Sequence, residues 1–194
     1  ADICVEVASA ASLDDINIVR RPNGKIRDSV AIRGLLVNGE KCDHSMPDTI
    51  VDAKIGLVAA DIDIPDFAQT VNVQVTDNSA VKDFIASRKE QLLEISQSIR
   101  ASGLNTLFCS RQIHPVIIED LADKGVYVVR SVTRSDMEAL SKATGARIIA
   151  NFDSVAEKDL GSAGLLEEIS IGDKPMVKIT KTPNESTVSV LVRA

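Results

Sequence analysis

A few acidic residues offer the clearest chance of chemistry in this chain. Asp61, Asp63 and Asp66 follow an apolar segment, and carboxylates at this spacing resemble the start of a calcium loop. The sequence lacks the glycine and the distant glutamate of such a loop, so any cation would bind weakly. With Asp153, Asp61 and Asp63 could instead form the cation site of a small metal-dependent α/β hydrolase at strand ends, which stays as an alternative.

Cysteine and histidine residues give weaker signals. Cys42 and His44 flank Asp43 and could ligate a metal, but no second ligand pair follows at a finger-like spacing, so we predict no metal site. Cys4, Cys42 and Cys109 are an odd number without a close pair, which is typical of a reducing compartment. Cys109 is predicted to be a small buried hydrophobe.

The other signatures of catalysis are missing from the sequence. The phosphate-binding loop, the dinucleotide-binding glycine motif and the nucleophile elbow do not occur. Because the chain has only two histidines, a serine or cysteine nucleophile would have few general bases available. His114 precedes Pro115 at a predicted helix start, where a solvent-facing side chain is the simpler interpretation. We therefore predict no catalytic residue and no cofactor.

Composition narrows the class of protein. The 194 residues are 44% hydrophobic, enough for a substantial core. A net charge of -6 and 3% aromatic residues argue against binding nucleic acid. No apolar run approaches the roughly 20 residues that span a bilayer, and the start lacks a signal peptide, so the prediction is a cytoplasmic protein without membrane contact.

The predicted elements begin with strands and continue as alternating strands and helices. Residues 16–20 and 25–30 are predicted to form a hairpin around Pro22-Asn23-Gly24. Further strands are predicted at residues 3–7, 30–37, 53–60, 106–109, 126–130, 147–150 and 187–193. One helix is predicted at residues 113–124 and ends at Gly125. A second is predicted from Ser135 to Gly145, with Ser135 and Glu138 as a capping box. A further helical segment is predicted to end at Leu160-Gly161. The strand-helix-strand units favour parallel pairing.

The longest predicted helix covers residues 78–102, between a capping Asp77 and Gly103. Its apolar positions follow a helical rhythm that Arg88 interrupts. We expect the carboxyl half to pack on the domain and the amino half to leave it.

Several segments resemble group II chaperonins, the thermosome and its eukaryotic cytosolic relatives. The similar segments are Met46-Pro47-Asp48, Ala53-Lys54-Ile55, Ser135-Asp136-Met137-Glu138 and Ala143-Thr144-Gly145-Ala146. Their order and spacing match the family's apical domain over nearly all of the chain beyond Asp14. The sequence departs from the family at Ile118, where Gln is usual, and at Ser110-Arg111-Gln112.

This resemblance implies an α/β fold: a β-sandwich flanked by helices, with a long helical protrusion that acts as a lid. It assigns residues 1–31 to the intermediate domain, 32–186 to the apical domain with the protrusion at about 61–92, and 187–194 to a strand returning to the intermediate domain. It also implies a piece of a longer chaperonin, because the Gly-Asp-Gly-Thr-Thr motif of the equatorial ATP site is absent here. ATP and Mg²⁺ would bind in that domain of the parent protein, and this segment alone would not be an enzyme.

The resemblance further implies binding of unfolded polypeptides and contact with neighbouring subunits in a ring. Helical spacing turns Ile113, Val116, Ile117 and Leu121 of the inner-rim helix toward the core. The residues left for polypeptide binding are His114, Ile118, Glu119, Asp120 and Asp123, and those for the lid tip are Val81, Lys82, Phe84 and Ile85. A third hypothesis is an oligomerisation module without a polypeptide-binding surface.

Overall fold

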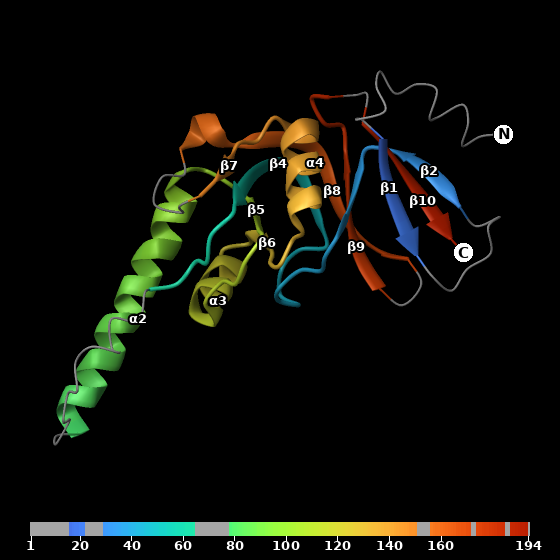
Figure 1. Ribbon diagram of the computed structural model, residues 1–194. Coiled ribbons are helices and arrows are strands. Elements are labelled where there is room, and N and C mark those ends of the chain that lie inside the picture. The colour runs from blue at the N-terminus through green and yellow to red at the C-terminus, as the bar shows by residue number, and fades with distance from the viewer. Residues whose placement is uncertain are drawn as a thin grey trace.

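The computed structural model describes residues 16–21, 29–64, 78–150, 156–171, 174–184 and 187–193. Within them, two β-sheets and two α-helices form a body from which a third, longer α-helix projects (Figure 1). This mixed arrangement confirms the predicted α/β class. Residues 3–7, the turn at 22–24 and the turn at 151–153 lie outside the described parts of the chain.

The larger sheet has the strand order β3-β9-β8-β4-β5-β6, with β7 paired to the end of β4. Its strands are β3 (Leu35–Asn38), β4 (Thr49–Val58), β5 (Thr106–Cys109), β6 (Tyr127–Val129), β7 (Ile148–Ile149), β8 (Gly161–Ile171) and β9 (Lys174–Thr180). β4, β5 and β6 run parallel, as the strand-helix-strand pattern predicts, while β3, β9, β8 and β4 alternate in direction. The sheet therefore joins a parallel half to an antiparallel half at β4.

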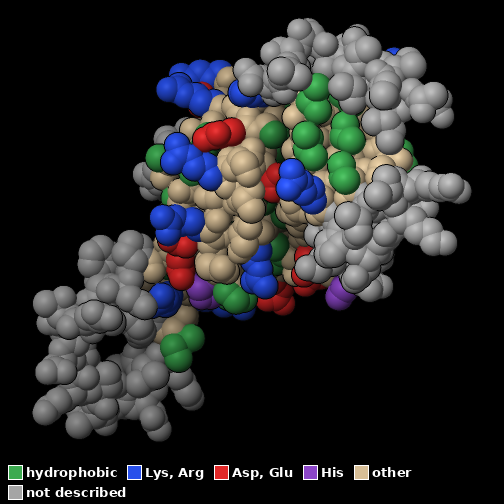
Figure 2. All heavy atoms as spheres, turned by 45° about the vertical axis from the view of Figure 1, so that its right-hand side comes forward, with side chains coloured by type: hydrophobic (Ala, Val, Ile, Leu, Met, Phe, Trp, Pro, Cys, Tyr) green, Lys and Arg blue, Asp and Glu red, His purple; other side chains and the backbone are tan. Residues whose placement is uncertain are grey.

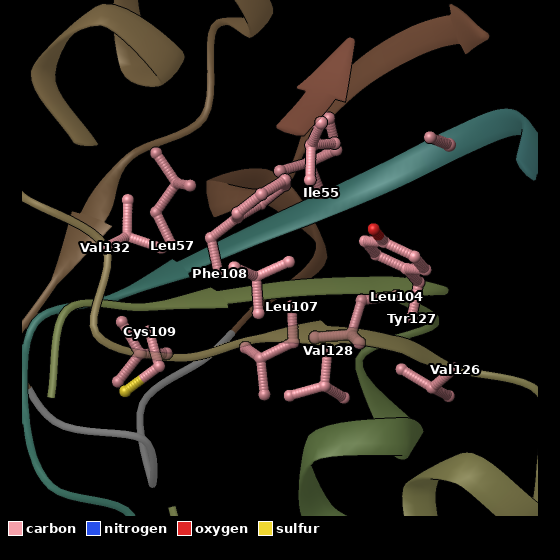
Figure 3. Close-up of a cluster of buried hydrophobic side chains, with 14 of the residues drawn as sticks. Ile55, Leu57, Leu104, Leu107, Phe108, Cys109, Val126, Tyr127, Val128 and Val132 are labelled. Carbon is pink, nitrogen blue, oxygen red and sulfur yellow. The ribbon is translucent and has the colours of Figure 1, made fainter. Parts of the chain in front are cut away.

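The main core lies along the parallel half. All four residues of β5 and all three of β6 are buried, because helices and loops cover both faces of these short apolar strands. Figure 3 shows Ile55 and Leu57 from β4 meeting Phe108 and the side chains of the neighbouring strands. Cys109 is fully buried in this cluster, as predicted.

The smaller sheet has the order β1-β10-β2, made of β1 (Ile16–Arg21), β10 (Val188–Arg193) and β2 (Val30–Arg33). Residues 22–28 lie outside the described parts of the chain, so the predicted hairpin of residues 16–20 with 25–30 stays a prediction. β1 and β2 do not pair with each other, because β10 lies between them, parallel to β1 and antiparallel to β2. The local turn signal at residues 22–24 carried no information about a strand that arrives from the far end of the chain.

Gly34 divides the predicted strand 30–37 between the two sheets. Its φ of 123° is open to glycine but not to residues with a side chain, and a Cβ there would lie 2.2 Å from the Ile179 carbonyl oxygen. The chain turns at this point, so β2 belongs to the smaller sheet and β3 to the larger.

Helix α4 (Arg134–Thr144) packs against β3, β4 and β8, with Met137, Leu140 and Ala143 buried as predicted. Its amino-terminal cap differs from the prediction. Thr133 accepts the backbone N–H of Asp136, whereas Glu138 pairs with Arg134 one turn away. The capping pair is therefore shifted by two residues toward the amino terminus, and Gly145 ends the helix with φ 75° as expected.

The segment before Gly161 contains a short 3-10 helix, η5 (Glu157–Asp159), and Gly161 begins β8 rather than closing a longer helix. The hairpin of β8 and β9 was not predicted. Its residues 165–171 pair with 174–180 in antiparallel register. The sequence of β8 does not alternate regularly between apolar and polar residues, so it gives a weak strand signal. Pairing with β9 and β4 on its two edges stabilises β8 as a strand.

Helix α2 (Asn78–Ala101) has 24 residues, which gives a length of about 36 Å. We call residues 92–101 its root and residues 78–91 its arm. Leu92, Ser96 and Ile99 of the root are buried, whereas residues 85–91 of the arm are exposed except for half-buried Arg88. The carboxyl half packs on the body and the amino half leaves it, as expected from the sequence (Figure 1).

A buried serine joins the two sheets. The Ser189 hydroxyl in β10 accepts the Leu36 N–H and donates to the Gly34 carbonyl, both at 2.9 Å. The Asn17 side-chain amide donates to the Leu36 carbonyl at 2.9 Å. These side chains satisfy backbone groups at the outer edge of β3 that another strand would otherwise pair. A small apolar cluster of Val19, Leu36, Met176 and Leu191 accompanies them.

We expect Ser189→Ala to lower the free energy of unfolding by about 1–3 kcal/mol, because the buried Leu36 N–H loses its acceptor. Ser170→Ala in β8 is the matched control, since Ser170 is exposed and its replacement should change stability by less than about 0.5 kcal/mol. Urea unfolding followed by circular dichroism measures both. Equal stability of the two variants would show that Ser189 does not hold the sheets together.

Candidate functional site

Helix α3 (Pro115–Asp123) and the root of α2 pack side by side and form the candidate surface. α3 follows β5 and contacts β6 on one side and α2 on another. Its buried residues are consequently consecutive as well as periodic: Ile117, Ile118, Leu121 and Ala122. The helix therefore exposes a narrower face than an amphipathic helix packed on one side only.

The expectation that Ile118 faces solvent is wrong. Its side chain is 7% exposed and belongs to the main core cluster. Helical periodicity predicts an exposed Ile118 only if α3 packs against the body on one side. In the structure α3 packs against β6 on one side and against α2 on another. Val116, expected inside, is only half-buried.

His114 caps α3 instead of standing free in solvent. Its Nδ1 accepts the backbone N–H of Val116 at 3.2 Å, which satisfies one of the unpaired donors of the first turn. The neutral tautomer with the proton on Nε2 is the form that can accept at Nδ1. His114 is half-buried and therefore has a local structural role in addition to any role in binding.

The three acidic residues of α3 lie in different surroundings. Glu119 and Asp123 are exposed, as expected for a binding surface. Asp120 is half-buried, and its Oδ2 accepts the hydroxyl of Ser96 in α2 at 2.5 Å. One of the predicted binding residues thus contacts the neighbouring helix.

A hollow of about 330 Å³ lies beside the start of α3, lined by residues that include Asp61, Asp63, Gln112, His114 and Arg130. The segment that carries Asp61 and Asp63 is attached to the start of α3 through a β-bridge between Ile62 and Ile113. Both acids lie near guanidinium groups: Asp61 is 3.9 Å from Arg111, and Asp63 is 4.0 Å from Arg88. The hollow therefore carries mixed charge.

The hydrolase alternative receives no support from this arrangement. Across the described parts of the chain, no group of three or more His, Cys, Asp or Glu side chains could hold a metal ion. Asp66 and Asp153 lie outside those parts. Asp61 also accepts the backbone N–H of Gln112, and Asp63 that of Ile64, so both carboxylates serve the local backbone.

In the loop with Cys42, Asp43 and His44, the polar groups of Asp43 serve local hydrogen bonds. Asp43 accepts the backbone N–H and the hydroxyl of Ser45 at 2.8 and 2.7 Å, and these hydrogen bonds lower the pKa of its carboxyl. Burial raises the pKa of the Cys42 thiol and raises that of Cys109 to about 11, so neither is activated as a thiolate nucleophile.

Of the four residues predicted for the lid tip, Ile85 is 62% exposed on α2. Val81 and Lys82 lie in the helical part of α2, as does Phe84, but their side chains are outside the described set. Figure 2 shows Lys, Arg, Asp and Glu side chains interspersed over one face of the body, with a group of hydrophobic side chains at the upper right.

Sequence reasoning missed several residues that shape this surface. The sequence pattern shows Arg88 only as an interruption of an apolar stripe, and it does not distinguish Arg130 or Ser96. An arginine in the stripe with an aspartate-rich segment earlier in the chain was a usable signal for the Arg88 ion pair. The sequence contains no comparable signal for Ser96, because a serine within a helix is usually expected to be exposed to solvent.

Comparison with known proteins identifies the class. Residues 1–194 match the sequence model of the TCP-1/cpn60 chaperonin family, and the chain therefore belongs to that family. The resemblance to group II chaperonins found in the sequence is confirmed.

Individual relatives agree with this assignment. The chain is 35% identical over 180 residues to thermosome subunit beta of Thermoplasma acidophilum, covering 93% of this chain and 33% of the relative. It is 32% identical to a thermosome subunit of Methanocaldococcus jannaschii, again over 93% of this chain and 33% of the relative. The open-state monomer of a group II chaperonin from Methanococcoides burtonii superposes with a TM-score of 0.78 at 30% identity, covering 94% of this chain and 39% of that one. The chain spans about a third of the length of these curated relatives.

No helix in the described ranges is long and apolar enough to cross a membrane.

We expect millimolar Mg²⁺ to leave the Tm unchanged, because Arg88 and Arg111 place positive charge beside the carboxylates of Asp63 and Asp61. Differential scanning fluorimetry with and without the ion measures this. A Tm that rises with Mg²⁺ concentration, and no longer does so in Asp63→Asn, would revive the hydrolase hypothesis.

Proposed function

We propose that this chain is the polypeptide-binding and lid-bearing part of a group II chaperonin subunit, corresponding to the apical domain. The observation that carries the proposal is the arm of α2, which leaves the body next to α3 and is exposed along residues 85–91 apart from Arg88. A helical extension whose described side chains are mostly exposed is suited to contacting other molecules.

Client polypeptides would bind along α3 and the adjoining arm. Glu119 and Asp123 provide charge on α3, while Ile85 provides apolar surface on the arm. Hydrophobic contact is non-directional, so it does not demand one client sequence. Because Ile118 is buried, the apolar contribution comes from the arm more than from α3.

The remaining assignments follow from the family. We propose that the smaller sheet belongs to the intermediate domain, with the boundaries near Gly34 and Thr187 where the chain passes between the sheets. Neighbouring subunits of a ring would be its partners, and ATP with Mg²⁺ would act in a part of the subunit outside this chain. A cytoplasmic location accords with this function.

We expect the chain to suppress aggregation of a chemically unfolded test protein, and Ile85→Ser to weaken that suppression. The exposed part of an isoleucine side chain contributes about 1–2 kcal/mol when a client buries it, which is about 5- to 30-fold in affinity. Light scattering during dilution of the unfolded protein measures the effect.

Val51→Ser is the matched control, because Val51 is 66% exposed and lies in β4, outside α2 and α3. Equal loss in both variants would mean that exposed apolar surface in general is responsible. No suppression by the unsubstituted chain, combined with self-association in sedimentation experiments, would favour the oligomerisation module instead.

A further inference from the structure

Ser96 is a polar residue in the middle of an apolar contact. It lies between Leu92 and Ile99 on the buried face of the root of α2 and is 0% exposed. Its hydroxyl donates to Asp120 of α3 at 2.5 Å. A hydrogen bond to an ionised carboxylate is stronger than one between neutral groups, and it depends on direction.

We propose that Ser96 and Asp120 are positioning residues that set the direction in which the arm projects from the body. The importance of this direction for client binding rests on the function proposed above. The role of Ser96 and Asp120 in setting the direction does not depend on that function.

The apolar part of the contact fixes this direction poorly. The root extends over about 15 Å and the arm over about 21 Å, so a small tilt at the root becomes a larger displacement at the free end. Leu92 and Ile99 supply hydrophobic attraction, which has no preferred direction and so selects one tilt less sharply than a hydrogen bond does.

The polar pair makes alternative packings unfavourable. A shift of α2 by one turn in either direction would place Leu92 or Ile99 where Ser96 now meets Asp120. The half-buried carboxylate would then lose its donor against an apolar side chain, which is costly in a partly desolvated position. A single arrangement of the two helices keeps both the apolar contact and the hydrogen bond.

A second polar contact lies where the arm leaves the body. Arg88, two turns before Ser96 on the same side of α2, is 4.0 Å from Asp63. Asp63 adjoins Ile62, whose β-bridge to Ile113 connects it to the start of α3. Both polar contacts therefore link α2 to α3 and the segment before it.

The test measures the distance between spin labels at Ser79→Cys in the arm and Lys142→Cys in α4, in a chain carrying Cys4→Ser and Cys42→Ser. Cys109 is fully buried and stays. We expect a narrow distance distribution in this background and a broader or displaced one with Ser96→Ala. A tilt of about 10° would move Ser79 by about 4 Å, since it lies about 25 Å along the helix from Ser96.

Ser98→Ala is the matched control, because Ser98 is exposed on the same helix and its replacement changes helix propensity equally. We expect Asp120→Asn, which removes the charge of the acceptor, to broaden or displace the distances as well, and Asp123→Asn, exposed on α3, is its control. Distributions that are the same for Ser96→Ala and Ser98→Ala would overturn the proposal.

The double variant Ser96→Val with Asp120→Leu separates positioning from stability. Replacing both polar groups with apolar ones should restore the Tm lost in Ser96→Ala, while the distance distribution stays broad. A narrow distribution in this variant would show that apolar packing alone directs the arm, and the proposal would fail.

The same variants separate this inference from the proposed function. If Ser96→Ala broadens the distances but aggregation suppression is absent in every chain, including the unsubstituted one, the positioning role stands and the proposed function fails. If suppression is present and responds to Ile85→Ser while the distances do not respond to Ser96→Ala, the function stands and the positioning role fails.

Discussion

β4 carries hydrogen bonds on both edges, and the other parts of the structure are attached to it. Its first half pairs with β8, and its second half pairs with β5 on the opposite edge and with β7. Ile55 pairs with both Gly161 and Thr106, so the antiparallel and parallel halves of the sheet meet at one residue. The side chains of residues 55–58 are buried. The parallel half leads to α2 and α3, and the antiparallel half leads to the smaller sheet.

Two joints in the structure each contain a fully buried serine. Ser189 joins the smaller sheet to β3, and Ser96 joins α2 to α3. Beside Ser189 the apolar cluster is small, and beside Ser96 the buried apolar residues Leu92 and Ile99 lie along one stripe of α2. Hydrophobic contact supplies attraction there without a preferred direction. A serine hydroxyl adds a short, directional contact at the cost of little volume. Ser189 links the two sheets, and Ser96 is the residue to which we assign the direction of the arm.

The candidate site was predictable in position but not in detail. Glu119 and Asp123 are exposed as expected. Ile118 was misplaced because helical periodicity gives the side of a helix that is buried and not how many neighbours bury it. Asp120 and Ser96 were not recognised as a pair, since they are 24 positions apart on different helices.

The sequence by itself determined the local elements with strong periodicity or a clear end signal, such as α2, β5 and the end of α4 at Gly145. Only the tertiary structure decided which strands pair, because pairing depends on segments far apart in the chain. β10 enters between β1 and β2, and the hairpin of β8 and β9 completes the sheet beside β4. The hydrogen bond to which we assign the direction of the arm likewise joins Ser96 and Asp120, which are 24 positions apart on different helices, so the local sequence gives no signal for it.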